Sequence, residues 1–435
     1  MNFLQRFGIA CAVALAEFAV CPSAAAAAAE PLPSQVAQRA CAAIAGRVGA
    51  ASGPPVFLVS YTSEGATSQP ALKTAAFTYD NALAVIALIA CGRVPQAVRV
   101  GEALRKAALG GPRLLNAYRA GVVEGQPLPN GWWDAKANQW AEDPYQMGTA
   151  TGNVAWAGLA LLALDRATGD RRWRDAAERL ALWIVDNAWD ASGTPGFTGG
   201  VEGFDPHPQK LRWKSTEHNV DAAALLAWLA RGSSSNRWSQ PAREAMHFVA
   251  TQWDATTGRF LVGTLPDGRE NTGTSAIDVQ MWAQLLPGAR PDWRRALAYA
   301  QAHFAVDGGF DFNTDRDGVW LEGTAQAALV YGTLGNTARA DALFRTIDAE
   351  FSPGGYVYAT REARITTGLA LSPQSTTADF YYYHWPHLAP TAWAVLAAKA
   401  WNPFVPHGAA HDPGKSDLSP RAPQRAVSHE ANFPR

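Results

Sequence analysis

Six segments of the sequence repeat one plan, and this repeat constrains the fold more than any other feature. In each segment a polar stretch leads into an alanine- and leucine-rich helix of about three turns. The polar leads are Asp80, Asn153, Glu217, Asp278, Glu322 and Thr391, spaced by 73, 64, 61, 44 and 69 residues. The helices that follow are apolar on nearly every side, which predicts that they are buried.

Amphipathic segments with arginine and glutamate on one face lie between the apolar helices. They comprise residues 34–48, 94–108, 172–187, 238–252, 292–303 and 337–350. Each predicted hairpin buries its apolar side against its neighbours, so the simplest packing is an inner ring inside an outer ring. The sequence therefore predicts an all-α fold, an (α/α)6 toroid over residues 30–401, with short β pieces at 260–264 and 356–360.

The two ends of the chain differ in composition from the repeats. Arg6, the apolar residues 7–20 and the small residues 23–29 are typical of a signal peptide, so we predict a periplasmic or secreted protein. No later stretch is apolar enough to predict a membrane span. Residues 402–435 are rich in proline, histidine, serine and charge without helical period, which predicts a disordered tail.

Two cysteines remain if the signal peptide is removed, Cys41 and Cys91. In an oxidising compartment such a pair is expected either to form a disulfide or to stay as two buried thiols, because geometry decides between them. The sequence alone does not decide between a disulfide and two free thiols.

The charge balance and the aromatic content of the chain limit the kinds of molecule that it is expected to bind. With 37 basic and 38 acidic residues the chain has no basic excess of the kind that nucleic-acid binding requires, and we expect a monomer that binds carbohydrate. Many of the 17 tryptophans adjoin Gly, Asn, Asp or Pro, a placement suited to cleft walls where a flat ring stacks on a sugar. Residues 109–152, 190–215 and 381–387 are predicted to build the rim of that cleft.

The polar leads should meet at one end of the ring, because each of them begins an inner helix. The residues predicted to bind substrate around this cleft are Tyr79, Trp132, Trp133, Asn153, Trp213, His218, Asn219, Trp320, Tyr382, His384 and Trp385.

Four phrases carry a family resemblance: TYDNALAVIAL, WKSTEHNVDAAALL, AIDVQMW and VWLEGTAQAALVYGTLG. Together with the six-fold alternation, they make residues 33–401 resemble the six-hairpin glycosidase superfamily. The resemblance implies the toroid fold and carbohydrate chemistry. The same toroid also hosts polysaccharide lyases, sugar epimerases and terpene cyclases, so the fold alone does not fix the reaction.

Glycoside cleavage with inversion needs one protonated carboxyl and one carboxylate that activates water. Glu217 and Glu322 are the predicted pair. Trp320 beside Glu322 favours the acid role, whereas Lys214 and His218 beside Glu217 favour the ionised base. Asp80 and Asp278 are rival catalytic carboxylates. All four could instead cap helix N-termini, where a negative charge meets the helix dipole favourably.

Two alternatives to hydrolysis follow from the same residues. A polysaccharide lyase would use Tyr381–His384, His218 and Asn219 with basic groups for the uronate, drawn from Arg212, Lys214, Arg361 and Arg364. A glycan-binding toroid without catalysis would have aromatic walls but no cooperating carboxylates.

No cofactor is expected apart from a calcium ion at one acidic stretch. Asp311, Asn313, Asp315 and Asp317 alternate before Gly318, as at the start of a calcium loop. The glutamate expected at the end of such a loop is replaced by Thr324, and an ordinary turn explains the stretch as well. His384 and His387 lack the further ligands of a zinc site.

Overall fold

The computed structural model describes residues 30–63, 68–231, 236–370, 376–378 and 380–407. The chain divides into a unit Met1–Pro31 and a unit that begins at Leu32, and the second contains every helix and strand described below. The predicted signal peptide, residues 1–29, lies outside the described residues. Within the part of the chain that is described, no helix combines the length and hydropathy needed to cross a membrane.

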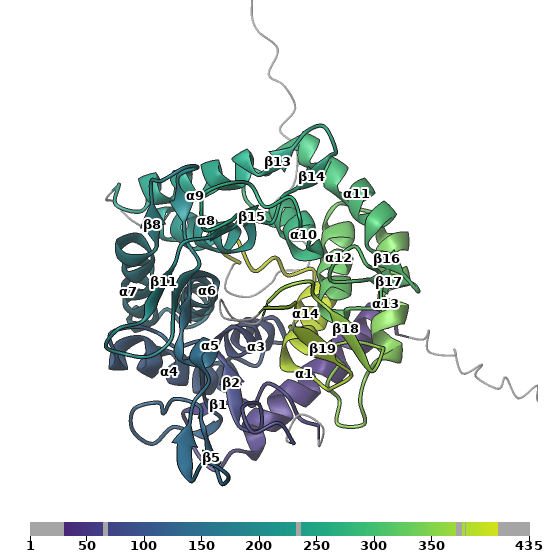
Figure 1. Cartoon of the computed structure of the whole chain (residues 1–435). Helices are drawn as coiled ribbons and strands as arrows, with labels where there is room; N and C mark the ends of the chain where they lie inside the picture. Colours follow the sequence, from purple (N-terminus) through teal and green to yellow (C-terminus); the bar gives the residue numbers. More distant parts are fainter. Residues whose placement is uncertain (1–29, 64–67, 232–235, 371–375, 379, 408–435) are drawn as a thin grey trace, which may run out of the picture. The chain divides into compact units, whose positions relative to one another are not determined.

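Six buried helices form a closed inner ring (Figure 1). They are α3 (Thr78–Ala90), α6 (Thr151–Thr168), α8 (Thr216–Arg231), α10 (Ile277–Leu285), α12 (Leu321–Thr333) and α14 (Leu388–Ala398). Each packs against the next one along the chain, and α14 packs against α3 to close the ring. Apolar side chains on almost every face explain this placement, since such a helix must be covered on all sides.

Six amphipathic helices surround this ring. They are α1 (Leu32–Ala50), α4 (Val94–Gly110), α7 (Arg172–Asn187), α9 (Ser239–Thr251), α11 (Arg295–His303, preceded by the 3-10 helix η1, Pro291–Arg294) and α13 (Thr337–Ala349). Each outer helix precedes an inner helix in the chain and packs on the ring, as Figure 1 shows. The prediction of an (α/α)6 toroid is confirmed.

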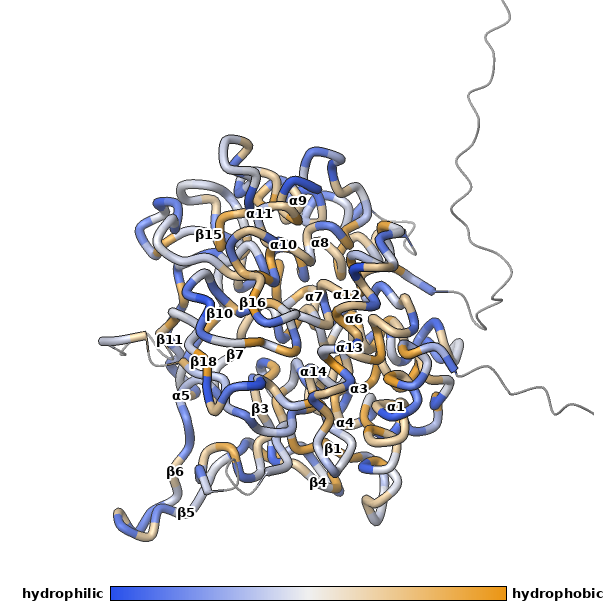
Figure 2. The backbone as a smooth tube through the Cα atoms, turned by 90° about the vertical axis from the view of Figure 1, so that its right-hand side faces the viewer, coloured by the Kyte–Doolittle hydropathy of each residue, from blue (hydrophilic) through white to orange (hydrophobic). Residues whose placement is uncertain are grey.

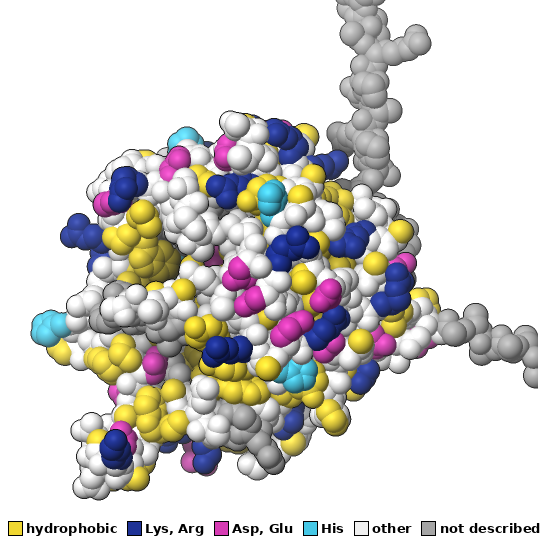
Figure 3. Space-filling model, turned by 45° about the vertical axis from the view of Figure 1, so that its right-hand side comes forward, with side chains coloured by type: hydrophobic (Ala, Val, Ile, Leu, Met, Phe, Trp, Pro, Cys, Tyr) yellow, Lys and Arg dark blue, Asp and Glu magenta, His cyan; other side chains and the backbone are white. Residues whose placement is uncertain are grey.

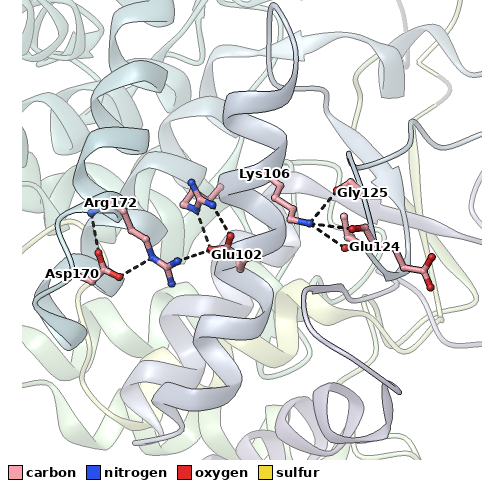
Figure 4. Close-up of polar contacts among 8 residues, drawn as sticks. Glu102, Lys106, Glu124, Gly125, Asp170 and Arg172 are labelled. Carbon is pink, nitrogen blue, oxygen red and sulfur yellow. Dashed lines mark hydrogen bonds and ion pairs between the residues drawn. The ribbon is translucent and has the colours of Figure 1, made fainter.

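Helix α4 illustrates why the outer ring stays outside. Its buried face includes Val100 and Leu104, while its outer face carries Glu102, which pairs with Arg105 at 2.6 Å and with Arg172 of α7 at 3.7 Å (Figure 4). On the other side Lys106 donates to backbone carbonyls of the loop at residues 123–125. Exposed pairs of this kind contribute little free energy, so burial of the apolar face holds the helix in place.

The strands are short and antiparallel, and they lie in the connections between helices. They are β1 (Val56–Phe57), β2 (Ala75–Phe77), β3 (Ala117–Arg119), β4 (Gly121–Val122), β5 (Trp132–Asp134), β6 (Gln139–Ala141), β7 (Thr149–Ala150), β8 (Trp189–Asp190), β9 (Gly196–Phe197), β10 (Gly200–Glu202), β11 (Gln209–Leu211), β12 (Lys214–Ser215), β13 (Trp253–Asp254), β14 (Arg259–Phe260), β15 (Gly263–Thr264), β16 (Ala305–Val306), β17 (Gly309–Phe310), β18 (Arg364–Thr366) and β19 (Tyr381–Tyr383). A four-residue helix, α5 (Pro144–Met147), precedes β7.

Several of these strands lie on one side of the helical core. Strands β5–β7, β10, β11 and β18 lie on the left in Figure 2, and hydrophobic residues concentrate in the helices to their right. The predicted β piece at 260–264 corresponds to β14 and β15. Residues 356–360 make only isolated bridges, to Phe351, Pro386 and Trp320.

A repeated side-chain amide contact fixes the start of three inner helices. The fourth residue of α3, α8 and α10 is Asn81, Asn219 or Gln280, and its amide exchanges two hydrogen bonds with one backbone residue of the preceding loop. For Asn219 that residue is Phe197, at 2.9 Å for both bonds. A buried amide committed in this way is not free to bind substrate. The prediction of Asn219 as a substrate ligand is therefore wrong.

The centre of the ring is filled below its polar end by tryptophan. Trp156, Trp282 and Trp393 contact one another with ring centroids 5.4–5.7 Å apart. Phe404 packs beneath them at 5.3 Å from Trp156 and is almost completely buried. The predicted boundary of the tail at residue 401 is therefore wrong, because residues 402–407 belong to the folded unit. Residues 408–435 lie outside the described part.

Cys41 of α1 and Cys91 at the end of α3 form a disulfide, with their Cα atoms 6.0 Å apart. The bond joins an outer helix to the inner helix that follows it in the chain. The sequence left this bond and two free thiols as alternatives, and the structure shows the bond.

We expect the double variant C41S/C91S to unfold at a lower temperature than the oxidised wild type. A disulfide that closes a loop of this length contributes about 4 kcal/mol, which in a chain of this size corresponds to about 5 °C. Activity at 25 °C should persist, because Cys91 lies at the end of α3 opposite Tyr79 and Asp80. Differential scanning calorimetry with and without reductant checks this. Equal melting temperatures for the variant and the oxidised wild type would contradict it.

Candidate functional site

The candidate site lies where the inner helices begin, on the side that carries the strands. Tyr79, Glu217, Asp278 and Glu322 occupy the same position, the second residue, in α3, α8, α10 and α12. Because the helices form a ring, equivalent positions project toward one region at its centre. Figure 3 shows, at the left of its view, a hollow walled largely by hydrophobic side chains.

Glu322 is the most deeply held of the three carboxyls, with only 3% of its surface exposed. Its Oε1 accepts a hydrogen bond of 2.5 Å from the hydroxyl of Tyr79. That hydroxyl in turn accepts one of 2.8 Å from Nε1 of Trp393, and Nε2 of Gln326 donates to Oε1 from 3.4 Å. With Oε1 occupied as an acceptor, a proton on Glu322 belongs on Oε2.

The pKa of Glu322 is raised to about 8. Burial is the main cause, the charges of Asp80 and Asp278 add to the rise, and the Tyr79 hydrogen bond opposes it. A carboxyl with this pKa is protonated at neutral pH. It can therefore donate a proton, as a general acid must.

Asp278 is also buried, at 5% exposure, and its Oδ1 accepts a hydrogen bond from the backbone N–H of Val279. Burial raises the pKa of Asp278 to about 6, and the Val279 bond opposes that rise. Of the two values, that of Asp278 is the lower, so Asp278 ionises first as the pH rises.

Glu217 is only partly buried. Its pKa is raised well above the ordinary value by burial and then by the charges of Asp278 and Glu322. This corrects the prediction that Lys214 and His218 keep Glu217 ionised. The Lys214 ammonium donates to three backbone carbonyls between Asp190 and Thr194, and burial lowers the pKa of His218 to about 4, so this imidazole is neutral.

The principal causes of the pKa shifts of the three carboxyls are burial, other carboxyls and hydrogen-bond donors, and within the described residues no lysine or arginine is among these causes. Three negative charges in such a space repel one another strongly, so the group retains protons at neutral pH.

Tyrosines border the carboxyls. Burial and the charges of Glu322, Glu217 and Asp278 raise the pKa of Tyr382 well above its ordinary value, which places it near all three. Burial, followed by the charges of Asp80 and Glu322, raises the pKa of Tyr61. Burial also raises the pKa of Tyr145, followed by the charges of Glu217 and Asp80. The sequence did not identify these last two, because Tyr61 lies in a loop and Tyr145 in the short helix α5, both outside the repeated openings.

Asp80 has a different setting from the other three carboxyls. Its Oδ2 lies 3.0 Å from Nε2 of His387, both side chains are buried, and Tyr61 stacks on the imidazole at 4.2 Å. Asp80 was predicted as a rival catalytic carboxylate. The structure gives it a buried partner and the third position in α3, next to the site, from which its charge raises the pKa of Glu322.

Other residues predicted to bind substrate divide into two groups. Asn153, Trp213 and His218 lie around the openings of α6 and α8: Asn153 donates to Asn116 at 2.8 Å, and Trp213 packs on His218 with centroids 5.4 Å apart. Trp320, by contrast, is buried between Phe312 and Tyr382. It supports the wall of the site and is not exposed to a ligand.

Four further residues lie in the surrounding loops. His384 stacks on Tyr358 and donates from Nδ1 to the carbonyl of Thr360, and Trp385 stacks on Tyr383. Trp132 and Trp133 belong to the β5–β6 hairpin, which projects from the edge of the molecule in Figure 2. Trp385 also contacts Tyr61, with ring centroids 5.9 Å apart, and as substrate ligands these four residues stay a prediction.

The acidic stretch before α12 is a compact turn. Oxygens of Asp311, Asp315 and Asp317 lie within 4.8 Å of one another. They accept backbone hydrogen bonds within the stretch, such as that from Asp317 to Asp311 at 2.9 Å, and Asn313 does the same for Asp315. An ordinary turn accounts for these contacts, and the calcium ion stays a prediction.

The structure resembles solved structures of enzymes that act on sugars. A glycosidase variant in complex with glucose matches with a TM-score of 0.55 at 14% identity, over 85% of this chain and 98% of that chain. The cellobiose 2-epimerase from Spirochaeta thermophila matches with 0.59 at 14%, over 87% and 99%. The GH76 α-mannanase from Bacteroides thetaiotaomicron matches with 0.51 at 11%, over 85% and 95%.

The chain has the six-hairpin toroid fold. No protein-family model and no curated protein matches the sequence. At such low identity the likeness establishes the fold of the six-hairpin toroid, and its chemistry has to be argued from the residues of this site.

Proposed function

We propose that this toroid is a glycoside hydrolase that acts on an uncharged oligo- or polysaccharide. The observation that carries the proposal is the set of carboxyls at equivalent positions of α8, α10 and α12, of which those of α10 and α12 are buried and have separated pKa values. Titratable groups whose environments separate their pKa values are the usual acid and base of a hydrolase.

In the proposed reaction Glu322 is the acid and Asp278 the base. Asp278 takes a proton from water, the resulting hydroxide forms the new bond at the anomeric carbon, and Glu322 protonates the departing glycosidic oxygen as that bond breaks. The base role moves from Glu217, the sequence-based choice, to Asp278, because burial and the charges of Asp278 and Glu322 raise the pKa of Glu217 well above its ordinary value. Glu217, partly exposed, is available to bind a sugar hydroxyl.

Inversion is part of the proposal. It requires that a water molecule fit between Asp278 and the anomeric carbon, and proton NMR of the first anomer released tests it.

A lyase acting on uronates is disfavoured by where the basic residues lie. Lys214 is committed to backbone carbonyls, Arg361 pairs with Glu350 at 2.8 Å, and Arg364 lies over the ring of Tyr381. Of the four basic residues considered for a lyase, these three are held by other groups and only Arg212 is exposed beside the site, so the described residues offer an anionic sugar little positive charge. The substrate class we propose is therefore neutral.

Export remains part of the proposal, and the Cys41–Cys91 disulfide supports it, since such bonds persist in oxidising compartments. Fractionation of the producing cells tests this part on its own.

The test of function is a glycan panel. Wild-type protein is incubated at pH 7 with neutral, uronate-containing and amino-sugar glycans, and new reducing ends are measured. We expect release from a neutral glycan. An unsaturated uronate product would establish a lyase, and an epimerised sugar without new reducing ends would contradict hydrolysis.

The pH dependence of kcat/KM should be bell-shaped with its maximum near pH 7. Activity rises as Asp278 loses its proton, with a pKa of about 6, and falls as Glu322 loses its own, with a pKa of about 8. Initial rates from pH 4.5 to 9.5 check this. The residual activity of E322Q should lack the alkaline limb, and an unchanged alkaline limb in that variant would exclude Glu322 as the acid.

A further inference from the structure

Tyr382 forms a wall beside the three carboxyls, and it reaches this place from a separate hairpin. It lies in β19, opposite Ile365 of β18. Its ring packs on Trp320 with centroids 5.5 Å apart and on Phe312 at 6.0 Å. Because β18 and β19 make a small two-stranded sheet, which is marginal by itself, something outside it must hold it in place.

The acidic stretch before α12 supplies that support through one residue of β18. Oδ2 of Asp315 accepts a 2.6 Å hydrogen bond from the hydroxyl of Thr366, and Oδ2 of Asp317 accepts one of 2.9 Å from the Thr366 backbone N–H. The amide of Asn313 donates to the Thr366 carbonyl at 3.3 Å. Hydroxyl, N–H and carbonyl of Thr366 are thus all bound by the stretch, and two of these bonds are to carboxylates, which makes them strong.

A close backbone approach belongs to the same contact. A Cβ at Gly318 would meet the carboxyl group of Glu362 and lie 2.6 Å from Cγ2 of Ile365, so a side chain at this position would displace these two residues. Val319 donates its N–H to Glu362, just before β18, at 2.7 Å. The chain then runs through Trp320 directly into α12 and Glu322. One segment therefore leads into the helix of the proposed acid and also contacts the hairpin that carries Tyr382.

We propose that Asp315 and Asp317 act as a latch on Thr366, which positions Tyr382 as a wall of the sugar-binding site. The three are positioning residues that act through Tyr382. The inference rests on the proposed function only in that the molecule in contact with Tyr382 is a sugar.

The decisive variant is T366A, which removes the hydroxyl bound by Asp315. T366S keeps that hydroxyl, and T314A removes the neighbouring exposed threonine of the same stretch as a matched control. Cellotetraose, mannotetraose and xylotetraose are titrated calorimetrically into inactive E322Q protein, and the tightest binder is used for every variant. Hydrogen exchange of the β18 and β19 amides is followed without sugar.

We expect T366A to weaken tetrasaccharide binding about fivefold and to raise KM equally while kcat stays within about twofold, because the wall contributes uniform binding. T366S and T314A should resemble wild type. Y382A should weaken binding about tenfold, and adding T366A to it should cost nothing more, since both act through one contact. In T366A the β18 and β19 amides should exchange about tenfold faster, and those of α12 at the wild-type rate.

Two results would overturn the latch: exchange of the hairpin amides at wild-type rate in T366A, or additive losses in Y382A/T366A. Failure of the proposed function looks different. A tetrasaccharide that binds and is not cleaved by wild type refutes hydrolysis and leaves the latch measurable. If none of the three binds, the exchange data alone decide the latch.

Discussion

We expect replacement of Glu322 with glutamine to lower the kcat of the proposed hydrolysis about 10³-fold, and replacement of Asp278 with asparagine to have an effect of the same order. Each substitution removes one partner of the acid–base pair and keeps the shape of the side chain, and positioned proton transfer contributes about 10²- to 10⁴-fold. Glutamine keeps an oxygen that can accept the Tyr79 hydroxyl, so the local geometry should survive.

The control for this experiment is E102Q, which makes the same substitution on the outer face of α4, where Glu102 pairs with Arg105 and Arg172. It should retain full activity. E217Q discriminates the two assignments of the base: we expect an increase in KM with a loss in kcat below about tenfold. Losses of about 10³-fold in E217Q with a mild effect in D278N would return the base role to Glu217.

The second large effect is on stability, and its sign depends on pH. The pKa of Glu322 is about 8 in the folded protein against 4.5 for an ordinary glutamate. Below pH 4.5 the carboxyl is protonated in both states and costs nothing. As the pH rises to 8 the unfolded chain loses the proton while the folded protein must keep it, so the folded state loses stability over this window.

E322Q should therefore be more stable than wild type at pH 8.5 and equally stable at pH 4. We expect a gain of about 5 kcal/mol at pH 8.5, or about 6 °C in the unfolding temperature. Thermal unfolding at both pH values checks this, with E102Q expected to stay within about 0.5 kcal/mol at each. If E322Q is less stable than wild type at pH 8.5, the buried Glu322 carboxyl does not destabilise the fold at that pH, and the prediction is wrong. Stabilisation on removal of an active-site group is common, because such sites hold groups unfavourable for folding.

The fold was predictable because its signal is local and repeated. An apolar helix such as α6 must be covered on all sides, and an amphipathic one such as α7 must cover something, so six copies of each leave few arrangements. Glu322 could be proposed for the same reason, since the start of an inner helix can be identified within a few residues. The end of the folded unit could not, because Phe404 is held by Trp156 from far away in the sequence.

The details of the site depended on contacts that sequence neighbours do not reveal. Lys214 adjoins Glu217 in the chain, yet its ammonium binds carbonyls of another loop. Asn219 looked like a ligand and is a structural tie to Phe197.

The sequence by itself determined the toroid, the end of the ring at which polar groups gather, and the residue types available there. Only the tertiary structure decided which of these residues lie close together and how the pKa of each carboxyl is shifted. A pKa depends on burial and on charges across the ring, and Tyr79, Asp278 and Glu322 come from three different helices. Periodicity is a property of neighbouring residues, whereas the electrostatics of a site belong to residues that only folding brings together.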